Sequence, residues 1–195
     1  MVIREESSNW ASEMMLNPNT VFLDLETTGL PSKDPETEAV QICILNLYDK
    51  VLFTGLINPQ RTIPEEVSAI HGITNAMVET APTFPEYAPF LLKVLKNKNV
   101  ICHNADFDIA LLFSLFKKYG FPKPEVSATH CSMDNYSAWD GTWNHKKDGF
   151  KWQKLPNLLG LEAHNAINDC RNTRQLLIRM SGALEEPDPE ELLDF

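Results

Sequence analysis

The strongest constraint on the fold is an apolar run that ends in two carboxylates. Residues 21–30, VFLDLETTGL, have the composition of a buried strand, yet Asp24 and Glu26 stand two residues apart near its end. Side chains at i and i+2 of a strand point to the same face, so these like charges would lie side by side and repel each other. Either a divalent cation lies between them, or they are two surface acids at a solvated strand end.

Length and composition predict one domain. A chain of 195 residues with 43% hydrophobic side chains is long enough to bury a core of its own. We expect residues 1–182 to form this domain, and the acidic, proline-containing residues 183–195 to be a mobile tail. No apolar run reaches the roughly 18 residues of a membrane span, and the N-terminus lacks the apolar core of a signal peptide.

Charge and cysteine usage narrow the classes of function. The formal net charge of −10 argues against a protein that grips long nucleic acids by non-specific phosphate contacts, because such proteins are usually basic. It is compatible with an enzyme whose bound cations reverse the local sign where a phosphate enters. The four cysteines are scattered without a C-x-x-C pair, which predicts reduced thiols, a cytoplasmic location, and neither a disulfide nor a structural zinc.

The order of the apolar segments indicates an α/β fold with a mixed five-stranded sheet flanked by helices. Three strands come first, the second and third as a hairpin, and two more strands then alternate with helices. Glycines mark three helix ends, and a T-x-x-E capping box opens one helix at Thr83. The expected strands are residues 20–26, 39–48, 51–57, 99–104 and 125–133, and the expected helices are residues 64–72, 85–97, 106–120 and 168–182.

Three further stretches carry polar groups without an evident structural purpose. HNADFD places Asp108 in the first turn of a helix, HNAIND places His164 at the start of the last helix with Asp169 inside it, and IHGIT lies at a helix-to-loop junction. Each stretch alone is more typical of a structural role, such as an acid that complements a helix dipole. Together, four carboxylates and one histidine supply the oxygen ligands and the near-neutral base that two-metal phosphodiester cleavage requires.

This motif set resembles a known family. DLETTGL, HNADFD and HNAINDC are similar, in order and separation, to the three exonuclease motifs of the DEDDh (DnaQ-like) 3′→5′ exonucleases, and SAIHGIT matches a further stretch of that family. The resemblance covers residues 20–180 and implies a ribonuclease H-like fold. The spacing from His164 to Asp169 is that of the DEDDh branch rather than of the branch with a tyrosine base, and CSM at Cys131 is similar to exonuclease X-like members.

The resemblance also implies a role for each motif residue. Asp24 would bridge two Mg²⁺ or Mn²⁺ ions, Glu26 and Asp169 would complete the site of the attacking water, and Asp108 would hold the second ion. His164 would deprotonate that water. The 3′-terminal nucleotide would contact a set of substrate-binding residues, with the histidine of the set near its base or sugar: Thr27, Gly29, Leu30, His71, Asn104 and Phe107.

These roles imply a metal-dependent 3′→5′ exonuclease that releases nucleoside monophosphates from single-stranded or frayed DNA ends. Two alternatives stay open. One is a 3′→5′ exoribonuclease, because the group that reads a 2′-OH cannot be located from the sequence. The other is a non-catalytic or proofreading subunit associated with a polymerase. The last six residues, EELLDF, have some similarity to peptides that bind sliding clamps, with Glu190 where glutamine is usual. So short a match arises easily by accident, and a disordered tail is the favoured interpretation.

One basic segment interrupts the acidic chain. Residues 145–154, HKKDGFKWQK, hold four lysines against one aspartate and interleave Phe150 and Trp152, with Trp139 and Trp143 just upstream. Lysines among aromatic residues suit a single strand of nucleic acid, through phosphate pairing and base stacking. On this hypothesis the lysines follow phosphates beyond the reach of a small substrate at the 3′ end: Lys146, Lys147, Lys151 and Lys154. The alternative is a solvated loop whose tryptophans fill the core beneath it.

Overall fold

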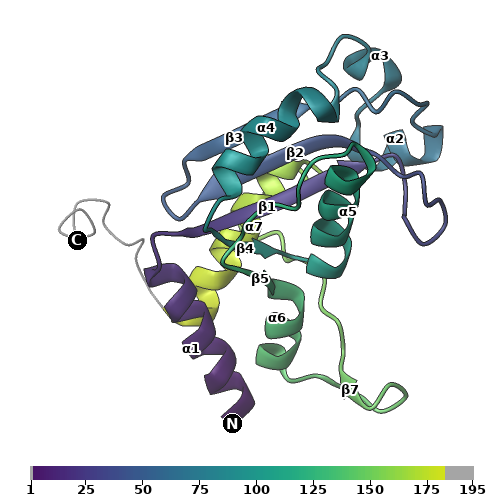
Figure 1. Cartoon of the computed structure of the whole chain (residues 1–195). Coiled ribbons are helices and arrows are strands. Elements are labelled where there is room, and N and C mark those ends of the chain that lie inside the picture. The colour runs from purple at the N-terminus through teal and green to yellow at the C-terminus, as the bar shows by residue number, and fades with distance from the viewer. Residues whose placement is uncertain (1, 183–195) are drawn as a thin grey trace.

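The computed structural model describes residues 2–182, which form one mixed sheet with helices on both faces (Figure 1). The sheet order is β3-β2-β1-β4-β5. Antiparallel pairs join β1 to β2 and β2 to β3, and parallel pairs join β1 to β4 and β4 to β5. The α/β class and the five-stranded mixed sheet are confirmed. The strands are β1 (Thr20–Thr27), β2 (Ala39–Asn46), β3 (Val51–Leu56), β4 (Asn99–Cys102) and β5 (Ala128–Cys131).

Strand β1 lies at the centre of the sheet and divides its side chains between two cores. Leu23 and Leu25 pack into the core under α4 (Phe84–Leu95) and α5 (Ala105–Lys118). Phe22 packs into the other core, with residues of α1 (Val2–Leu16) and α7 (Ala166–Ser181). Because side chains alternate along a strand, Asp24 and Glu26 continue the row of Phe22. Both acids therefore face the side of the sheet that carries α7.

The helices that the sequence predicts form where expected, apart from small shifts of their ends. The helix α2 (Glu65–His71) ends at Gly72, and α7 ends at Gly182; both glycines adopt the left-handed conformation, with φ of 72° and 73°. At the start of α4, the Glu86 carboxylate accepts a hydrogen bond of 2.7 Å from the backbone N–H of Thr83, as a capping box requires.

The sequence did not predict several of the helices and strands. The helices α1, α3 (Asn75–Val78) and α6 (Ser132–Asp140) and the short hairpin of β6 (Trp143–Asn144) and β7 (Gly149–Phe150) were not expected. The strand expected at residues 125–133 is too long, since β5 covers only Ala128–Cys131 and Ser132 begins α6. These elements are short or weakly amphipathic, so tertiary contacts rather than local pattern stabilise them.

Contacts with two neighbouring elements fix the position of α1. Trp139 of α6 donates a hydrogen bond from Nε1 to Ser8 Oγ at 3.1 Å, and Trp10 donates from Nε1 to His130 Nδ1 of β5 at 3.4 Å. Ala11 is fully buried among residues of α7 and the sheet. The N-terminal helix is thus part of the second core.

Three other expectations concern the cysteines, a membrane span and the tail. All four cysteines are free thiols, and three of them are buried, namely Cys43, Cys102 and Cys170. Within residues 2–182, no helix is long and apolar enough to cross a bilayer. The acidic tail, residues 183–195, lies outside the described residues.

We expect the substitution Ala11→Asp to test the docking of α1. An aspartate there places an unpaired charge in a fully buried position, which should cost about 3 kcal/mol or more of unfolding free energy. Thermal melting measures this loss, and Asn9→Asp on the exposed side of the same helix is the matched control. Equal melting temperatures for the two variants would show that α1 is not packed as described.

Candidate active site

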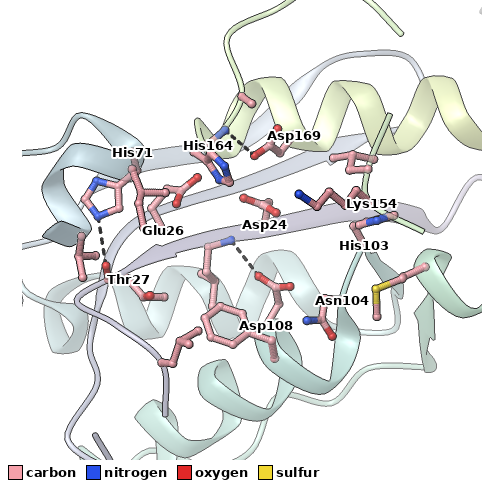
Figure 2. A pocket seen from close by; sticks show the side chains of 18 of the residues that line it. Asp24, Glu26, Thr27, His71, His103, Asn104, Asp108, Lys154, His164 and Asp169 are labelled. Atoms are coloured by element: carbon pink, nitrogen blue, oxygen red, sulfur yellow. Dashed lines mark hydrogen bonds between the residues drawn. The ribbon is translucent and has the colours of Figure 1, made fainter. Parts of the chain in front are cut away.

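A cavity of about 750 Å³ opens at the carboxyl ends of β1 and β4, between α2, α5 and α7 (Figure 2). Every motif residue to which the family resemblance assigns catalysis, metal binding or substrate contact lines this cavity, whereas Lys146, Lys147 and Lys151 of the basic segment do not. The structure therefore brings together eleven residues from distant parts of the sequence: Asp24, Glu26, Thr27, Gly29, Leu30, His71, Asn104, Phe107, Asp108, His164 and Asp169.

The four carboxylates come from three elements. Asp24 and Glu26 lie on β1, Asp108 lies in the first turn of α5, and Asp169 lies in the first turn of α7. A helix N-terminus carries partial positive charge, so α5 and α7 each offset part of the negative charge that they bring. Figure 2 shows Asp24, Glu26 and Asp169 pointing into the same space, with Asp108 below the strand. The interpretation of the opening pair as two surface acids is therefore wrong for Glu26, which is only 8% exposed.

Backbone hydrogen bonds hold the acids in place. The N–H of Leu25, between the two acids of β1, donates to Asp108 Oδ1 at 3.1 Å and ties α5 to the central strand. The N–H of His164 donates to Asp169 Oδ2 at 3.0 Å. Gln41 of β2 accepts from the N–H of Ala166 at 3.0 Å and so fixes the first turn of α7 to the sheet. Each carboxylate position is thus set by rigid elements.

Crowding and burial make the full ionisation of this cluster unfavourable. Burial raises the pKa of Asp24 well above its ordinary value, and the charges of Asp108, Glu26 and Asp169 raise it further. Burial, with Asp169 and Asp108 nearby, raises the pKa of Glu26 to about 8. Burial raises the pKa of Asp108 to about 7, although the Leu25 N–H opposes the shift. Burial also raises the pKa of Asp169, against the influence of His164.

The donor set fits a divalent cation. Ligand atoms of Glu26, His164 and Asp169 all lie within 4.8 Å of one another. Carboxylate oxygens are the ligands that Mg²⁺ and Mn²⁺ prefer. A bound cation would also relieve the repulsion that raises these pKa values. The chemistry and the electrostatics of the site both favour metal binding.

His164 has an unusual backbone conformation. It precedes α7 rather than starting it, and its φ of 58° is in the left-handed region that non-glycine residues rarely adopt. Such conformations persist only where the surroundings enforce them. Here the His164 N–H bonds to Asp169 Oδ2, and Asn165 caps α7 by accepting from the N–H of Ile167 at 3.2 Å. The exposed imidazole is held at the rim of the acid cluster.

His71 uses both ring nitrogens within the protein. Nδ1 accepts from the N–H of Ile73 at 3.0 Å, so the proton is on Nε2, which lies 3.2 Å from the carbonyl oxygen of Thr27. Burial lowers the pKa of His71, and the proximity of His164 lowers it further, which keeps this tautomer neutral. Both ring nitrogens of His71 are therefore occupied by partners within the protein. The direct task of His71 is to hold Thr27.

The loop after β1 is shaped by Thr27 and Gly29. Thr27 Oγ1 donates to the carbonyl oxygen of Gly29 at 2.7 Å. Gly29 has φ of 155°, where a side chain would be strained, so this turn requires glycine. Leu30 follows with 48% of its surface exposed and borders the cavity.

Trp152 and Lys154 of the basic segment also line the cavity, as does His103, for which the sequence predicted no role. The side chain of Lys154 points toward Asp24 in Figure 2. The expectation that this lysine lies beyond the reach of a small substrate is therefore wrong. His103 stands next to Asn104 in HNADFD, so its place in the motif was a usable signal, whereas nothing local in residues 145–154 indicates contact with β1.

A family model described as "RNase_T: Exonuclease" matches residues 21–177. The chain belongs to this exonuclease family, which confirms the DnaQ-like resemblance found in the motifs.

The curated relatives include a phage protein named as an exonuclease and proteins named as DNA polymerase III or its epsilon subunit. The "Uncharacterized exonuclease CP81" of Escherichia phage 186 is 32% identical over 187 residues, which cover 89% of this chain and 93% of the phage protein. The DNA polymerase III subunit epsilon of Rickettsia prowazekii is 38% identical over 172 residues, 83% of this chain and 73% of that protein. The chain spans only 12% of the PolC-type DNA polymerase III of Caldanaerobacter subterraneus, at 28% identity.

Two solved structures share the fold. Exonuclease X in complex with 5′ overhanging duplex DNA superposes with a TM-score of 0.56 at 24% identity, covering 85% of this chain and 92% of that one. Escherichia coli Exonuclease I in complex with a dA16 oligonucleotide gives a TM-score of 0.65 at 18% identity, covering 84% and 42%. At these identities the comparison establishes the shared architecture.

The raised pKa values predict how the metal-free protein responds to pH. Because the pKa values of Glu26 and Asp108 are raised to about 8 and about 7, their ionisation opposes folding. Stability is fully present below the ordinary carboxyl pKa of about 4 and is lost as the pH rises toward about 8. Melting in EDTA should therefore occur at a lower temperature at about pH 8 than at about pH 5.

Asp24→Asn keeps the shape of the side chain and removes one charge. In EDTA near pH 8 it should be more stable than wild type by about 1 kcal/mol. Mg²⁺ should stabilise wild type by mass action, and the variant should lose most of this gain. Asp106→Asn, an exposed carboxylate of the same helix turn as Asp108, is the control and should follow wild type. An Asp24→Asn protein that melts like wild type in EDTA and responds equally to Mg²⁺ would contradict a shared site.

Proposed function

We propose that this protein is a metal-dependent 3′→5′ exonuclease that removes nucleoside monophosphates from single-stranded or frayed DNA ends. The observation that carries the proposal is the convergence of four carboxylates and His164 in one cavity of about 750 Å³. Residues 1–182 would form the single exonuclease domain. The free thiols suit the reducing cytoplasm, where we place the enzyme.

The carboxylates would hold two Mg²⁺ or Mn²⁺ ions. Asp24, Glu26, Asp108 and Asp169 would supply the carboxylate oxygens that hold them. When bound, such ions neutralise the charge of the phosphate and lower the pKa of water, so that hydroxide is available near neutral pH. This arrangement rests on the donor set and on the raised pKa values of the carboxyl groups.

His164 would act as the general base. Its imidazole would take a proton from the attacking water, whose oxygen forms a bond to the phosphorus of the last phosphodiester. The bond between that phosphorus and the 3′ oxygen of the preceding nucleotide breaks. A nucleoside 5′-monophosphate leaves, and the shortened strand ends in a 3′-OH. Histidine suits this task because its ordinary pKa lies near neutrality.

The walls of the cavity would receive the terminal nucleotide. The turn from Thr27 to Leu30 forms one wall, and Asn104 and Phe107 at the start of α5 form another. The solved neighbours support a DNA substrate, since Exonuclease X was solved with overhanging duplex DNA and Exonuclease I with a dA16 oligonucleotide. RNA is the rival substrate, and the distinguishing group is the 2′-OH.

A direct assay decides between these substrates. Oligonucleotides labelled at the 5′ end, as single-stranded DNA, blunt duplex DNA and RNA, are incubated with Mg²⁺, with Mn²⁺ and with EDTA. We expect a ladder of products shortened from the 3′ end, fastest on single-stranded DNA, and none in EDTA. Activity in EDTA would contradict the metal dependence, and faster shortening of RNA would assign the enzyme to RNA.

A proofreading role in a polymerase assembly is a second candidate. It is favoured by the relative named DNA polymerase III subunit epsilon, which is 38% identical over 172 residues. A proofreading enzyme should resect a primer with a mismatched 3′ end faster than a matched primer, because the mismatch frays. Equal rates on the two primers would argue against this role. The proposed clamp-binding residues 190–195 lie outside the described residues.

The substitution His164→Ala tests the general base. Loss of the base should lower kcat by roughly 10²- to 10⁴-fold, while the stabilisation by Mg²⁺ in thermal melting should largely survive. Single-turnover rates on a DNA oligonucleotide measure the first effect. A variant that turns over at a near-normal rate removes His164 from the proton transfer, and a variant that no longer responds to Mg²⁺ would make His164 a metal ligand instead.

A further inference from the structure

A small hairpin stands next to the active-site cavity. Its strands β6 and β7 pair Trp143 with Phe150, whose rings meet edge to face with centroids 5.2 Å apart. The chain then continues along the edge of the cavity, where Trp152 and Lys154 both line it. A second cavity of about 340 Å³ lies beside the hairpin, and Trp152 borders this one too. The indole therefore connects the two cavities.

The exposure of Trp152 excludes a role in filling the core. Its surface is 65% exposed, whereas Trp139 packs partly buried in the second core. The Lys147 Nζ lies 4.6 Å from the centroid of the Trp152 ring, a cation–π arrangement that presents a charge and an aromatic face together. Within residues 2–182, neither Lys147 nor Lys154 forms an ion pair with a carboxylate.

Gln153 anchors the strand that carries these side chains. Its N–H donates to Ser137 Oγ at 3.0 Å, and its side-chain Nε2 donates to Asp140 Oδ2 at 3.0 Å, both on α6. Its carbonyl oxygen lies 3.2 Å from His103 Nε2, which must carry the proton because a carbonyl oxygen only accepts. His103 Nδ1 then accepts from Ser132 Oγ at 3.0 Å. With Gln153 held on three sides, Trp152 and Lys154 are presented by a fixed backbone.

We propose that Lys147, Trp152 and Lys154 form a platform that binds single-stranded DNA on the 5′ side of the terminal nucleotide. The platform runs outward from the acid cluster: Lys154 points toward Asp24, Trp152 joins the two cavities, and Lys147 borders the outer one. A base stacks on the indole and the lysines pair with phosphates, an arrangement that tolerates any base because every base has a π-face.

The local charge supports single-stranded DNA as the ligand of this platform. The chain as a whole carries −10, yet this platform presents two lysines without carboxylate partners beside an exposed tryptophan. Asp134 lies on the wall of the outer cavity, and its negative charge would repel a phosphate. Phosphates therefore favour the side of the lysines, and a base favours the indole. The proposal rests on the proposed function for the direction of the strand, and its test measures binding separately from hydrolysis.

Trp152→Ala should weaken the binding of single-stranded DNA. Fluorescence anisotropy of labelled dT10 in EDTA, where the proposed hydrolysis does not consume the probe, should show a Kd roughly 5- to 100-fold higher than that of wild type. Trp152→Phe keeps an aromatic face and should restore most of the affinity. Trp143→Ala is the matched control, because Trp143 is exposed on the hairpin that precedes Trp152 but lines neither cavity, and it should bind as wild type does.

The lysines are tested by salt dependence. Lys147→Ala should reduce the slope of log K against log salt by about 0.7, the contribution of one phosphate contact on a single strand. Lys146→Ala is its control, since Lys146 lies in the same turn and lines neither cavity. Thermal melting confirms that each variant is folded.

The outcomes separate the platform from the exonuclease activity. The platform proposal would be overturned if Trp152→Ala kept the wild-type affinity for dT10. It would also be overturned if Trp143→Ala lost as much affinity as Trp152→Ala. Wild-type binding weaker than about 0.1 mM, the weak limit of non-specific nucleic-acid binding, would overturn it as well. A wild-type protein that binds dT10 through Trp152 but never shortens it in Mg²⁺ would contradict the proposed function and leave the platform standing.

Discussion

The repulsion among four carboxylates in one partly buried site is the constraint on which the rest of the structure depends. Asp24 and Glu26 lie on the central strand, and Asp108 and Asp169 are brought to them by the first turns of two helices. Burial raises the pKa values of all four acids, and neighbouring carboxylates raise those of Asp24, Glu26 and Asp108 further. The ionised cluster therefore opposes folding unless a cation compensates it. The two cores on either side of β1 provide the stability that tolerates this cost.

The scaffold places each functional group on a rigid element or ties it to one. Leu25 links α5 to β1 through Asp108, and Gln41 links the first turn of α7 to β2. Two histidines that line the cavity serve this purpose rather than proton transfer. His71 holds Thr27, and His103, whose pKa burial lowers to about 4, holds Gln153 and so the strand with Trp152. His164, which is exposed at the rim, is free to meet a water molecule.

The helices and strands that were predicted are those whose pattern is local. Alternating and continuous apolar runs indicated β1 to β4, and glycines marked the ends of α2 and α7. The helix α1 was missed because its buried apolar residues, Ala11, Met14 and Met15, are confined to its second half. Its polar first half is stabilised by contacts with Trp139 and other distant residues. The predicted extent of β5 was wrong because the strand ends at Cys131 and α6 begins at the next residue.

The sequence by itself determined which residues make up the acid cluster and to which family the chain belongs. Both conclusions depend on residue types at short spacings, such as i and i+2 on a strand or the first turn of a helix. Only the tertiary structure decided how the rest of the cavity is built. The contact of His71 with Thr27 joins residues 44 apart in the sequence, and the contact of His103 with Gln153, which holds the strand of Trp152, joins residues 50 apart. The position of Lys154 beside Asp24 likewise depends on a distant segment. Such partners are chosen by packing of the whole chain, and no spacing in the sequence records them.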